Sequence, residues 1–358
     1  MITYLLLSPR HKAIVKTKLL HTFGIIDKNW EINGKSNNYQ MTSPTFLLDG
    51  IYKSMEGPKS SRYIQLNQND SLLWITKFKV EAIEDETKAK ISNDYICHTN
   101  IDLNDESYYT SFGLQDRIGK QYPRLTSLSN GFETIDFPEG YGIPIRANEF
   151  LYVTTQALNH NQAKILKKIK HLVTISYENY AINQKPLMSK TVFIQLPYNK
   201  ENPYEITDFS GSDQCIPVET KNHSYADGKG NMLSGHWVIA PGKKVYKSEI
   251  NSQLQLKDSL RLHYAAIHVH PFATRIKLYD KTTKTTVFSS TIENYKNKIG
   301  LLKVTPFSSK TGIWLYENHE YELQLETNNT SIVNQDMMGS MFLFFYDKEL
   351  DEKLKQLK

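Results

Sequence analysis

The sequence of 358 residues contains little cysteine and no long apolar run. Its two cysteines, Cys97 and Cys215, can form at most one bridge, which excludes a disulfide-rich scaffold and leaves the compartment open. No segment approaches the roughly 20 consecutive apolar residues that a membrane-spanning helix needs. The apolar start, residues 1–7, follows no basic segment and is short for a signal peptide. We therefore expect a soluble protein without a membrane span or an export signal.

A strong excess of one charge is also missing. The 43 Lys and Arg residues stand against 38 Asp and Glu, and the cations are scattered apart from the run at 164–170. A nucleic-acid-binding surface has a denser basic stripe with interleaved aromatic residues. With 39% hydrophobic residues and no internal repeat, the composition is that of a globular protein rather than a fibrous or disordered one. We expect no nucleic-acid partner, and none of these features encodes the oligomeric state.

Short strands separated by turn residues are what the sequence does contain. Four segments are rich in β-branched and aromatic residues: 72–80, 150–155, 191–196 and 321–325. Clusters of Pro, Gly, Asn and Asp lie between such segments, and no helical segments alternate with them as a parallel sheet would require. The pattern predicts an all-β fold of two tandem antiparallel β-sandwich domains.

A turn-rich segment, residues 199–235, sets the expected division of the chain near residue 200. The last residues place Leu350, Leu354 and Leu357 at helical spacing between charges, which predicts a short terminal helix. We therefore predict four parts: an N-terminal extension at 1–45, an N-terminal sandwich at 46–199, a C-terminal sandwich at 200–346 and a charged tail at 347–358.

The clearest candidate ligands are His268 and His270. Successive strand side chains alternate between faces, so these two imidazoles point the same way and can reach one metal ion. Pro271 ends the strand and leaves the pair at its end. By itself the pair is a weak signal, because two histidines on one face are often packing or surface residues. Four other histidines are not expected to be ligands: His223, His236 at a strand start, His263 and His319.

Two further segments carry candidate ligands. Residues 336–346 place methionines at the start of an apolar strand, where a thioether would join two imidazoles in a set that favours copper, Cu(I) in particular. The alternative is that these methionines fill the core. Cys97 and His98 face opposite sides of a regular strand, so both can bind one metal only if the strand bends or bulges. Otherwise Cys97 is a buried strand residue beside a hydrogen-bonded His98.

Three C-terminal segments resemble, in order, the copper type II, ascorbate-dependent monooxygenases, the family of the peptidylglycine α-hydroxylating and dopamine β-monooxygenases. These segments are residues 235–250, 266–272 and 336–346. In the N-terminal half, residues 136–142 and 151–156 are similar to the family's Pro-x-x-x-Gly turn and the strand after it. The resemblance implies two jelly-roll-like sandwiches with copper ions on facing sides of an open cleft between them.

The resemblance also implies a ligand set for the oxygen-binding copper. In the family this ion has a His-x-His pair and a methionine as ligands. These map to His268, His270 and Met338, with Met337 as the alternative methionine.

This sequence departs from the family at the ligands of the electron-donating copper. In the family these ligands are a His-His pair and a third histidine on a later strand. Here Cys97 and His98 take the place of the pair. Gln156 and Ala157 stand where the third histidine would fall, and His160 lies just beyond. The donor site is therefore either missing or rebuilt from Cys97, His98 and His160.

The function implied by the resemblance is a copper-dependent monooxygenase-like activity, with dioxygen activated in the interdomain cleft and ascorbate as the reductant. The substrate, a small molecule or a peptide, is not encoded in any motif. Hydroxylation in this family takes one electron from each copper, so a missing donor site favours an alternative. That alternative is a non-catalytic member of the same fold that binds one copper or a partner. A third hypothesis is a purely structural double sandwich without metal.

Overall fold

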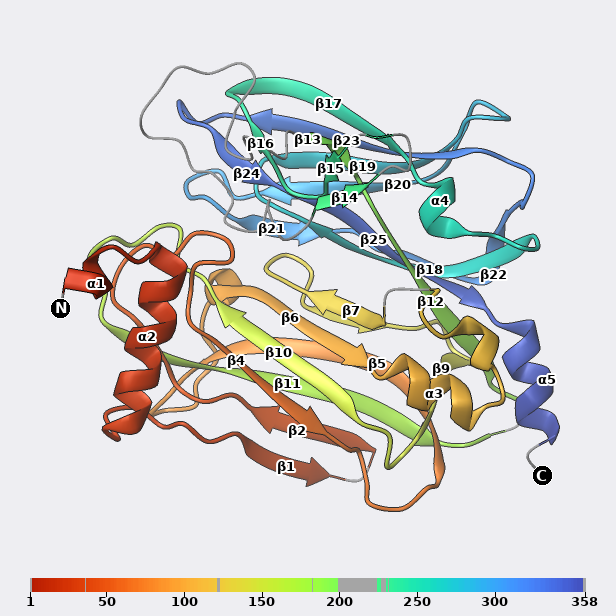
Figure 1. Ribbon diagram of the computed structural model, residues 1–358, viewed down its shortest axis with the longest axis horizontal. Helices are drawn as coiled ribbons and strands as arrows, with labels where there is room; N and C mark the ends of the chain where they lie inside the picture. Colours follow the sequence, from red (N-terminus) through yellow and green to blue (C-terminus); the bar gives the residue numbers. More distant parts are fainter. Residues whose placement is uncertain are drawn as a thin grey trace.

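The computed structural model describes residues 2–35, 37–120, 123–181, 183–198, 224–226, 230 and 232–356. In Figure 1 the N-terminal half lies below and the C-terminal half above, and each half consists of two layers of strands. Within the described residues the strand pairs are antiparallel, with one exception between the two halves. The predicted fold class, all-β with two tandem antiparallel jelly-roll-like β-sandwiches, is confirmed.

Alternating burial explains the strands of the N-terminal half. In β5 the side chains of Phe78 and Val80 are fully buried, whereas Lys77 and Lys79 remain partly exposed. One layer contains, in spatial order, β1 (Glu31–Lys35), β2 (Asn38–Thr42), β11 (Lys167–Asn179), β5 (Leu72–Glu84) and β9 (Tyr141–Arg146), with β3 (Phe46–Leu48) and β8 (Thr134–Asp136) at its margins. The other layer contains β4 (Lys59–Ile64), β10 (Leu151–Ala157), β6 (Ile96–Leu103) and β7 (Arg124–Leu128).

A strand of continuous apolar residues lies at the centre of the C-terminal half. This strand, β25 (Gly339–Tyr346), is buried almost end to end because it has a neighbour on each side and packs on both faces. Its layer contains β12 (Lys185–Phe193), β25, β18 (Leu260–Val269) and β22 (Phe307–Leu315). The second layer contains β17 (Gly242–Glu249), β23 (Tyr321–Asn329), β19 (Ala273–Asp280), β20 (Thr285–Asn294) and β21 (Leu301–Val304). Short pairings complete this half: β16 (Trp237–Ile239) with β24 (Gln335–Met337), and β15 (Met232–Ser234) with β13 (Leu196–Tyr198) and β14 (Ser224–Ala226).

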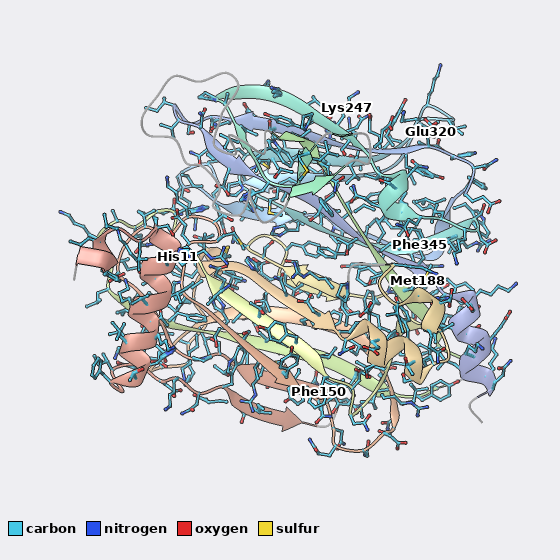
Figure 2. All side chains as sticks on the ribbon, in the orientation of Figure 1. His11, Phe150, Met188, Lys247, Glu320 and Phe345 are labelled. Carbon is cyan, nitrogen blue, oxygen red and sulfur yellow. The ribbon has the colours of Figure 1, made fainter. Side chains whose placement is uncertain are left out.

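Strand β12 joins the two halves into one continuous sheet. On one side it forms a short parallel pairing with β9, where Lys185 is opposite Tyr141. On the other side it pairs antiparallel with β25, and Met188 is opposite Phe345, as labelled in Figure 2. The backbone therefore hydrogen-bonds across the junction between the two sandwiches.

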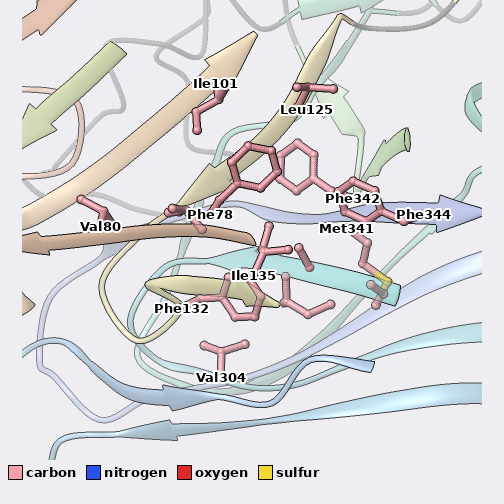
Figure 3. Close-up of a cluster of buried hydrophobic side chains, with 14 of the residues drawn as sticks. Phe78, Val80, Ile101, Leu125, Phe132, Ile135, Val304, Met341, Phe342 and Phe344 are labelled. Carbon is pink, nitrogen blue, oxygen red and sulfur yellow. The ribbon is translucent and has the colours of Figure 1, made fainter. Parts of the chain in front are cut away.

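An aromatic cluster fills the junction from within. The ring of Phe137, in the N-terminal half, lies 4.8 Å from that of Phe344 and 5.5 Å from that of Tyr264, both in the C-terminal half. Figure 3 shows neighbouring side chains from both halves, including Phe78 and Met341, in the same cluster. Because the halves share one hydrophobic core, they are held together here by apolar burial as well as by strand pairing.

The predicted division near residue 200 lies outside the described residues, as do most of the segment 199–235 and Cys215. The limits at 46–199 and 200–346 stay predictions. Before that segment, β12 already pairs with β25 of the C-terminal half. The predicted terminal helix is confirmed as α5 (Lys348–Gln356), in which Leu350 and Leu354 are buried, while Leu357 lies outside the described residues.

Helix α2 (Pro9–Thr22), in the expected N-terminal extension, was not predicted. It buries only Ala13 and Thr17, so it has no apolar stripe that periodicity could reveal. Its local signal is Ser8, whose side chain caps the helix, followed by Pro9 at the first position. The other short helical elements are α1 (Ile2–Leu5), α3 (Asp105–Ser111), α4 (Asn251–Leu254) and the 3-10 turns Asn93–Tyr95 and Gln115–Arg117. In the part of the chain that the structure describes, no helix has the length and apolar character to cross a membrane.

Candidate metal centre

Three buried side chains of the C-terminal half direct ligand atoms towards one another. One ring nitrogen each from His236 and His270 and one carboxylate oxygen of Asp336 lie within 4.8 Å of one another. Asp336 Oδ2 is 2.7 Å from His270 Nδ1 and 3.5 Å from His236 Nε2. Among the described residues, no other group of three His, Cys, Asp or Glu side chains converges in this way.

Short strands position these side chains. His236 directly precedes β16, and Asp336 lies in β24, which pairs with β16 so that Val238 is opposite Asp336. The Ser234 hydroxyl accepts a hydrogen bond from the His236 N–H at 3.1 Å and donates one to the His236 carbonyl at 2.9 Å, which fixes the backbone of His236. His270 follows the last residue of β18. The three residues thus come from the ends of three different strands.

The electrostatics of the group favour an ionised carboxylate. Burial by itself raises the pKa of Asp336, but the charges of the His270 and His236 side chains outweigh burial and hold that pKa well below its usual range. Within the described residues, no lysine or arginine forms an ion pair with Asp336. In this part of the chain the two imidazoles are thus the groups that balance the negative charge.

A small cavity lies on the other side of the His270 ring, with a volume of about 30 Å³, close to that of one water molecule. Cys97 and His160 of the N-terminal half and His268 and His270 of the C-terminal half all line it. His270 Nε2 is 3.4 Å from the Ser54 hydroxyl in this cavity, so its two ring nitrogens face two different sites. The candidates predicted for two separate coppers, apart from Met338 and His98, thus meet at one cavity.

Cys97 occupies a β-bulge. Gln156 on β10 pairs with His98, and the next residue, Ala157, pairs with Ile96, so Cys97 is left out of the pairing with β10. The bulge turns Cys97 towards His98, whose Nδ1 lies 3.3 Å from the Cys97 sulfur. A bulge at this strand is the condition under which Cys97 and His98 could bind the same metal ion, and the structure has that bulge. Burial raises the pKa of the Cys97 thiol to about 11, so at neutral pH it is protonated unless a metal ion displaces the proton.

His160 and His268 are both held in a neutral form. Burial lowers the pKa of His160, and burial together with the charges of His270 and His98 lowers the pKa of His268 well below its usual range. His160 Nδ1 is buried and has no hydrogen-bond partner within the described part of the chain. A neutral imidazole with such a nitrogen is the form that binds metal.

A loop of the N-terminal half covers the cavity. Met55 adopts a left-handed conformation with φ of 64°, and its N–H donates to the Cys97 sulfur at 3.5 Å. The Gln156 amide donates to the Gly57 carbonyl at 2.8 Å, which holds the loop against β10. Gln156, at the place where the sequence resemblance would put a histidine, therefore has a structural contact here.

Contacts between the halves close the other side of the cavity. Asn161 exchanges two hydrogen bonds with the backbone of Ile299, at 2.8 and 2.9 Å. The Leu301 N–H donates to the Asn130 side chain at 2.9 Å. The residues predicted as ligands thus lie at a buried junction, whereas the resemblance implied facing sides of an open cleft.

Met338 is half-buried where the chain passes from β24 to β25. It is not among the residues that line the small cavity. Met337 is fully buried opposite Trp237. The role of either methionine as a ligand stays a prediction.

A larger pocket of about 530 Å³ lies beyond the bulge, on the side of the N-terminal half that helix α2 covers. Its lining includes His98, Met55 and Gln156. The segments that line the small cavity therefore also border a space large enough for a small organic molecule.

His236 and Asp336 are the candidate ligands that the sequence did not indicate. The first is a single histidine before a strand, and the second is a single carboxylate in a segment considered for its methionines. The two residues come together through the pairing of β16 with β24, whose segments are far apart in the sequence. No local sequence pattern indicates that pairing.

No protein-family model matches this sequence, and no curated protein matches it significantly. Among solved structures, PNGase F, a glycosylasparaginase from Flavobacterium meningosepticum, aligns at 9% identity over 87% of this chain and 96% of its own, with a TM-score of 0.38. The major capsid protein P2 of bacteriophage PM2 aligns at 9% identity over 86% of this chain and 97% of its own, with a TM-score of 0.32. Because both TM-scores are low, neither similarity bears on activity, ligand or assembly.

Proposed function

We propose that this protein binds one divalent transition-metal ion through His236, His270 and Asp336. The observation that carries the proposal is the convergence of two imidazole nitrogens and one carboxylate oxygen within 4.8 Å in a buried place. A buried carboxylate usually has a cation or several hydrogen bonds as partners. Asp336 has two imidazoles and, within the described residues, no lysine or arginine. A bound cation would complete its charge balance.

Two of the three separations between the ligand atoms can be compared with those around a metal ion. Bonds of about 2.0–2.2 Å to nitrogen and oxygen place the ligand atoms of one tetrahedral ion about 3.3 Å apart. The separation of 3.5 Å between His236 Nε2 and Asp336 Oδ2 agrees with this value. The separation of 2.7 Å between His270 Nδ1 and the same oxygen is shorter, although neither atom has hydrogen-bond geometry with any described residue, and it would have to widen by about half an ångström.

The donor set narrows the choice of ion. Two imidazoles and one carboxylate suit Zn²⁺, Cu²⁺ and Fe²⁺, and the same set is used by non-haem iron oxygenases. A thioether such as that of Met338 would favour Cu(I). The carboxylate of Asp336 makes the site harder than the copper site implied by the sequence resemblance, so a divalent ion fits it best.

A copper-dependent, monooxygenase-like activity is our proposal for what the centre does. It is supported by the order of the sequence motifs and by the meeting of Cys97, His160, His268 and His270 at one cavity. A redox-active ion would supply dioxygen activation, with ascorbate as the outside reductant. The small cavity holds about one water molecule, so a substrate would occupy the larger pocket that His98 lines. The competing proposal is a non-catalytic centre that stabilises the junction or a partner interface.

Metal titration of the chelator-treated protein tests the binding proposal. We expect one ion per chain for the wild type with at least one of Zn²⁺, Cu²⁺ and Fe²⁺. We also expect a loss of more than about 100-fold in affinity for His236→Ala and for Asp336→Asn, because removing a ligand costs more than removing an outer hydrogen bond. Isothermal titration calorimetry and elemental analysis measure both quantities.

The matched control is His319→Ala. His319 Nδ1 lies 2.7 Å from Asp280 Oδ2, which is the same distance as between His270 Nδ1 and Asp336 Oδ2, but no third His, Cys, Asp or Glu ligand joins this pair among the described residues. This variant should bind the ion as the wild type does. Equal affinity in the wild type and both site variants, or no binding of any of the three ions, would contradict the proposal.

His268→Ala separates two possible positions of the ion. An ion at His236, His270 and Asp336 should be little affected by this change. An ion in the small cavity, at the Nε2 side of His270, would instead require His268 and would tolerate His236→Ala. Asp336 would then only orient His270, as outer carboxylates commonly do. That second outcome would replace the proposed ligand set with the one expected from the sequence.

Oxygen consumption with ascorbate then tests the activity. The copper-loaded wild type should consume dioxygen faster than the Asp336→Asn variant at equal total copper. Equal rates would show that copper outside the centre is responsible, and the non-catalytic proposal would be preferred.

A further inference from the structure

A second pocket, of about 420 Å³, lies at the opposite end of the junction between the halves, beside helix α5. Met188 and Lys190 of β12 line it, together with Leu256 from the loop before β18 and Leu260, the first residue of β18. Figure 2 labels Met188, which marks the position of the pocket. None of these residues belongs to the candidate metal centre, so a role for this pocket does not depend on metal binding.

Lys190 is a buried lysine whose amine makes no bond within the part of the chain that the structure describes. Its side chain is 8% exposed, and no hydrogen bond or ion pair joins its Nζ to any described residue. The carboxylate of Asp347 is close enough to interact with it electrostatically, but that group is already engaged. Arg117 donates to both Asp347 oxygens, at 2.5 and 3.0 Å, and to Glu349 at 2.6 Å.

The surroundings of Lys190 disfavour its charged form. Burial, followed by the charges of Arg117 and Lys257, lowers the pKa of Lys190 to about 8, and only Asp347 opposes them. At pH 7.5 about 20% of such an amine is neutral, against about 0.1% of an ordinary lysine. The other titratable groups of the described lining form no bond with Lys190 either: Tyr109, Asp116, Lys120, Asp258, Lys348 and Glu349.

Lys170 shows how the same chain treats a buried lysine that serves structure alone. Its side chain is 2% exposed, and its Nζ lies 2.8 Å from Asp27 and 2.7 Å from Glu31. Burial lowers the pKa of Lys170, but these hydrogen bonds outweigh it and raise the pKa above its ordinary value. Among the described residues, carboxylate partners therefore offset the cost of burying the Lys170 amine, and no hydrogen bond or ion pair does so for Lys190.

We propose that Lys190 is a nucleophilic amine that binds a small aldehyde or ketone in this pocket as a reversible imine. The neutral Nζ adds to the carbonyl carbon, and one of its two protons passes to the carbonyl oxygen, which gives a carbinolamine. Nitrogen then loses its remaining proton, the hydroxyl leaves as water, and the carbon–nitrogen double bond forms. The step needs no oxidant or reductant. Met188, Leu256 and Leu260 supply an apolar wall for the hydrocarbon part of the carbonyl compound.

Reductive trapping on the full-length protein tests this proposal. The protein is incubated with butanal and cyanoborohydride at pH 7.5, and the alkylated lysines are located by peptide mass spectrometry. We expect Lys190 to be modified at least about tenfold faster than Lys247, an exposed lysine labelled in Figure 2. The neutral fraction of Lys190 is larger by about two orders of magnitude, and the lower basicity of its amine cancels only part of this gain. Lys170 should not be modified while the protein is folded.

The pH dependence of the same reaction gives a second readout on the unmodified chain. The trapping rate at Lys190 should level off with a midpoint near pH 8, while the rate at Lys247 should still rise above pH 9. The variant Lys190→Arg keeps the charge and should lose only the modification at this position. A rate at Lys190 no higher than at Lys247 would overturn the proposal. Modification by glyoxylate but not by butanal would also overturn it, since that result indicates an anion site rather than a site with an apolar wall.

Discussion

Replacing Gly57 with alanine is expected to lower the free energy of unfolding by about 3 kcal/mol, the upper end of the usual range for overpacking. A Cβ atom at this position would lie 2.0 Å from the Ala157 carbonyl oxygen and 2.8 Å from its carbon. Both are backbone atoms of β10, so no rotation of a side chain can relieve the clash. The loop that covers the small cavity would have to move, and the hydrogen bond from Gln156 to the Gly57 carbonyl would be lost.

The displaced loop should also uncover Cys97, because Met55 donates to its sulfur and Ser54 lies beside it. Urea denaturation measures the stability change, and the reaction of Cys97 with a thiol reagent, followed by peptide mapping, measures the exposure. We expect faster modification of Cys97 in Gly57→Ala than in the wild type, where the thiol is buried and its pKa is about 11.

Gly34→Ala is the control for this prediction. A Cβ atom on Gly34 would meet no atom within 4 Å, so its effect should stay within about 0.5 kcal/mol. If Gly57→Ala is as stable as Gly34→Ala and Cys97 reacts no faster, the loop does not depend on the close contact with β10.

Protonation of His171 is expected to cost the folded state about 3 kcal/mol between pH 6.5 and about pH 4. The ring is fully buried, and burial lowers its pKa to about 4, although a hydrogen bond with the Tyr95 carbonyl opposes the shift. The unfolded chain takes up this proton near pH 6.5, and the folded chain does so only near pH 4. The contribution is therefore complete above about pH 6.5 and is lost progressively as the pH falls through this window.

The measurement is the free energy of unfolding as a function of pH for the wild type and His171→Gln. The variant should be less stable at neutral pH and should lose less stability on acidification, so the two curves approach each other towards about pH 4. His11→Gln, at the exposed histidine labelled in Figure 2, is the control and should follow the wild type. Parallel curves for wild type and His171→Gln would contradict the prediction, because they would mean that the folded and unfolded chains bind this proton equally well.

Lys170 and Lys190 are both buried, but the sequence does not show which of the two amines has a carboxylate partner. Both lysines lie in strand segments, and the basic run at 164–170 that ends at Lys170 does not indicate which of the two has a carboxylate partner. Lys170 meets Asp27 and Glu31 because the segment that precedes and begins β1 passes beside β11. Lys190 meets a pocket because β12 is placed at the junction of the two halves. The chemistry of each amine follows from these placements.

The sequence by itself determined the features that depend on neighbours along the chain. The strand period of two predicts the all-β fold and places His268 and His270 at a strand end, and helical spacing predicts α5. The tertiary structure alone decided which ligand atoms meet. His236 and Asp336 come together through the pairing of β16 with β24, and Cys97 turns towards His98 through a bulge. The physical reason is that local periodicity fixes the face on which a side chain lies, whereas the distance between side chains of remote segments depends on the order and register of the strands.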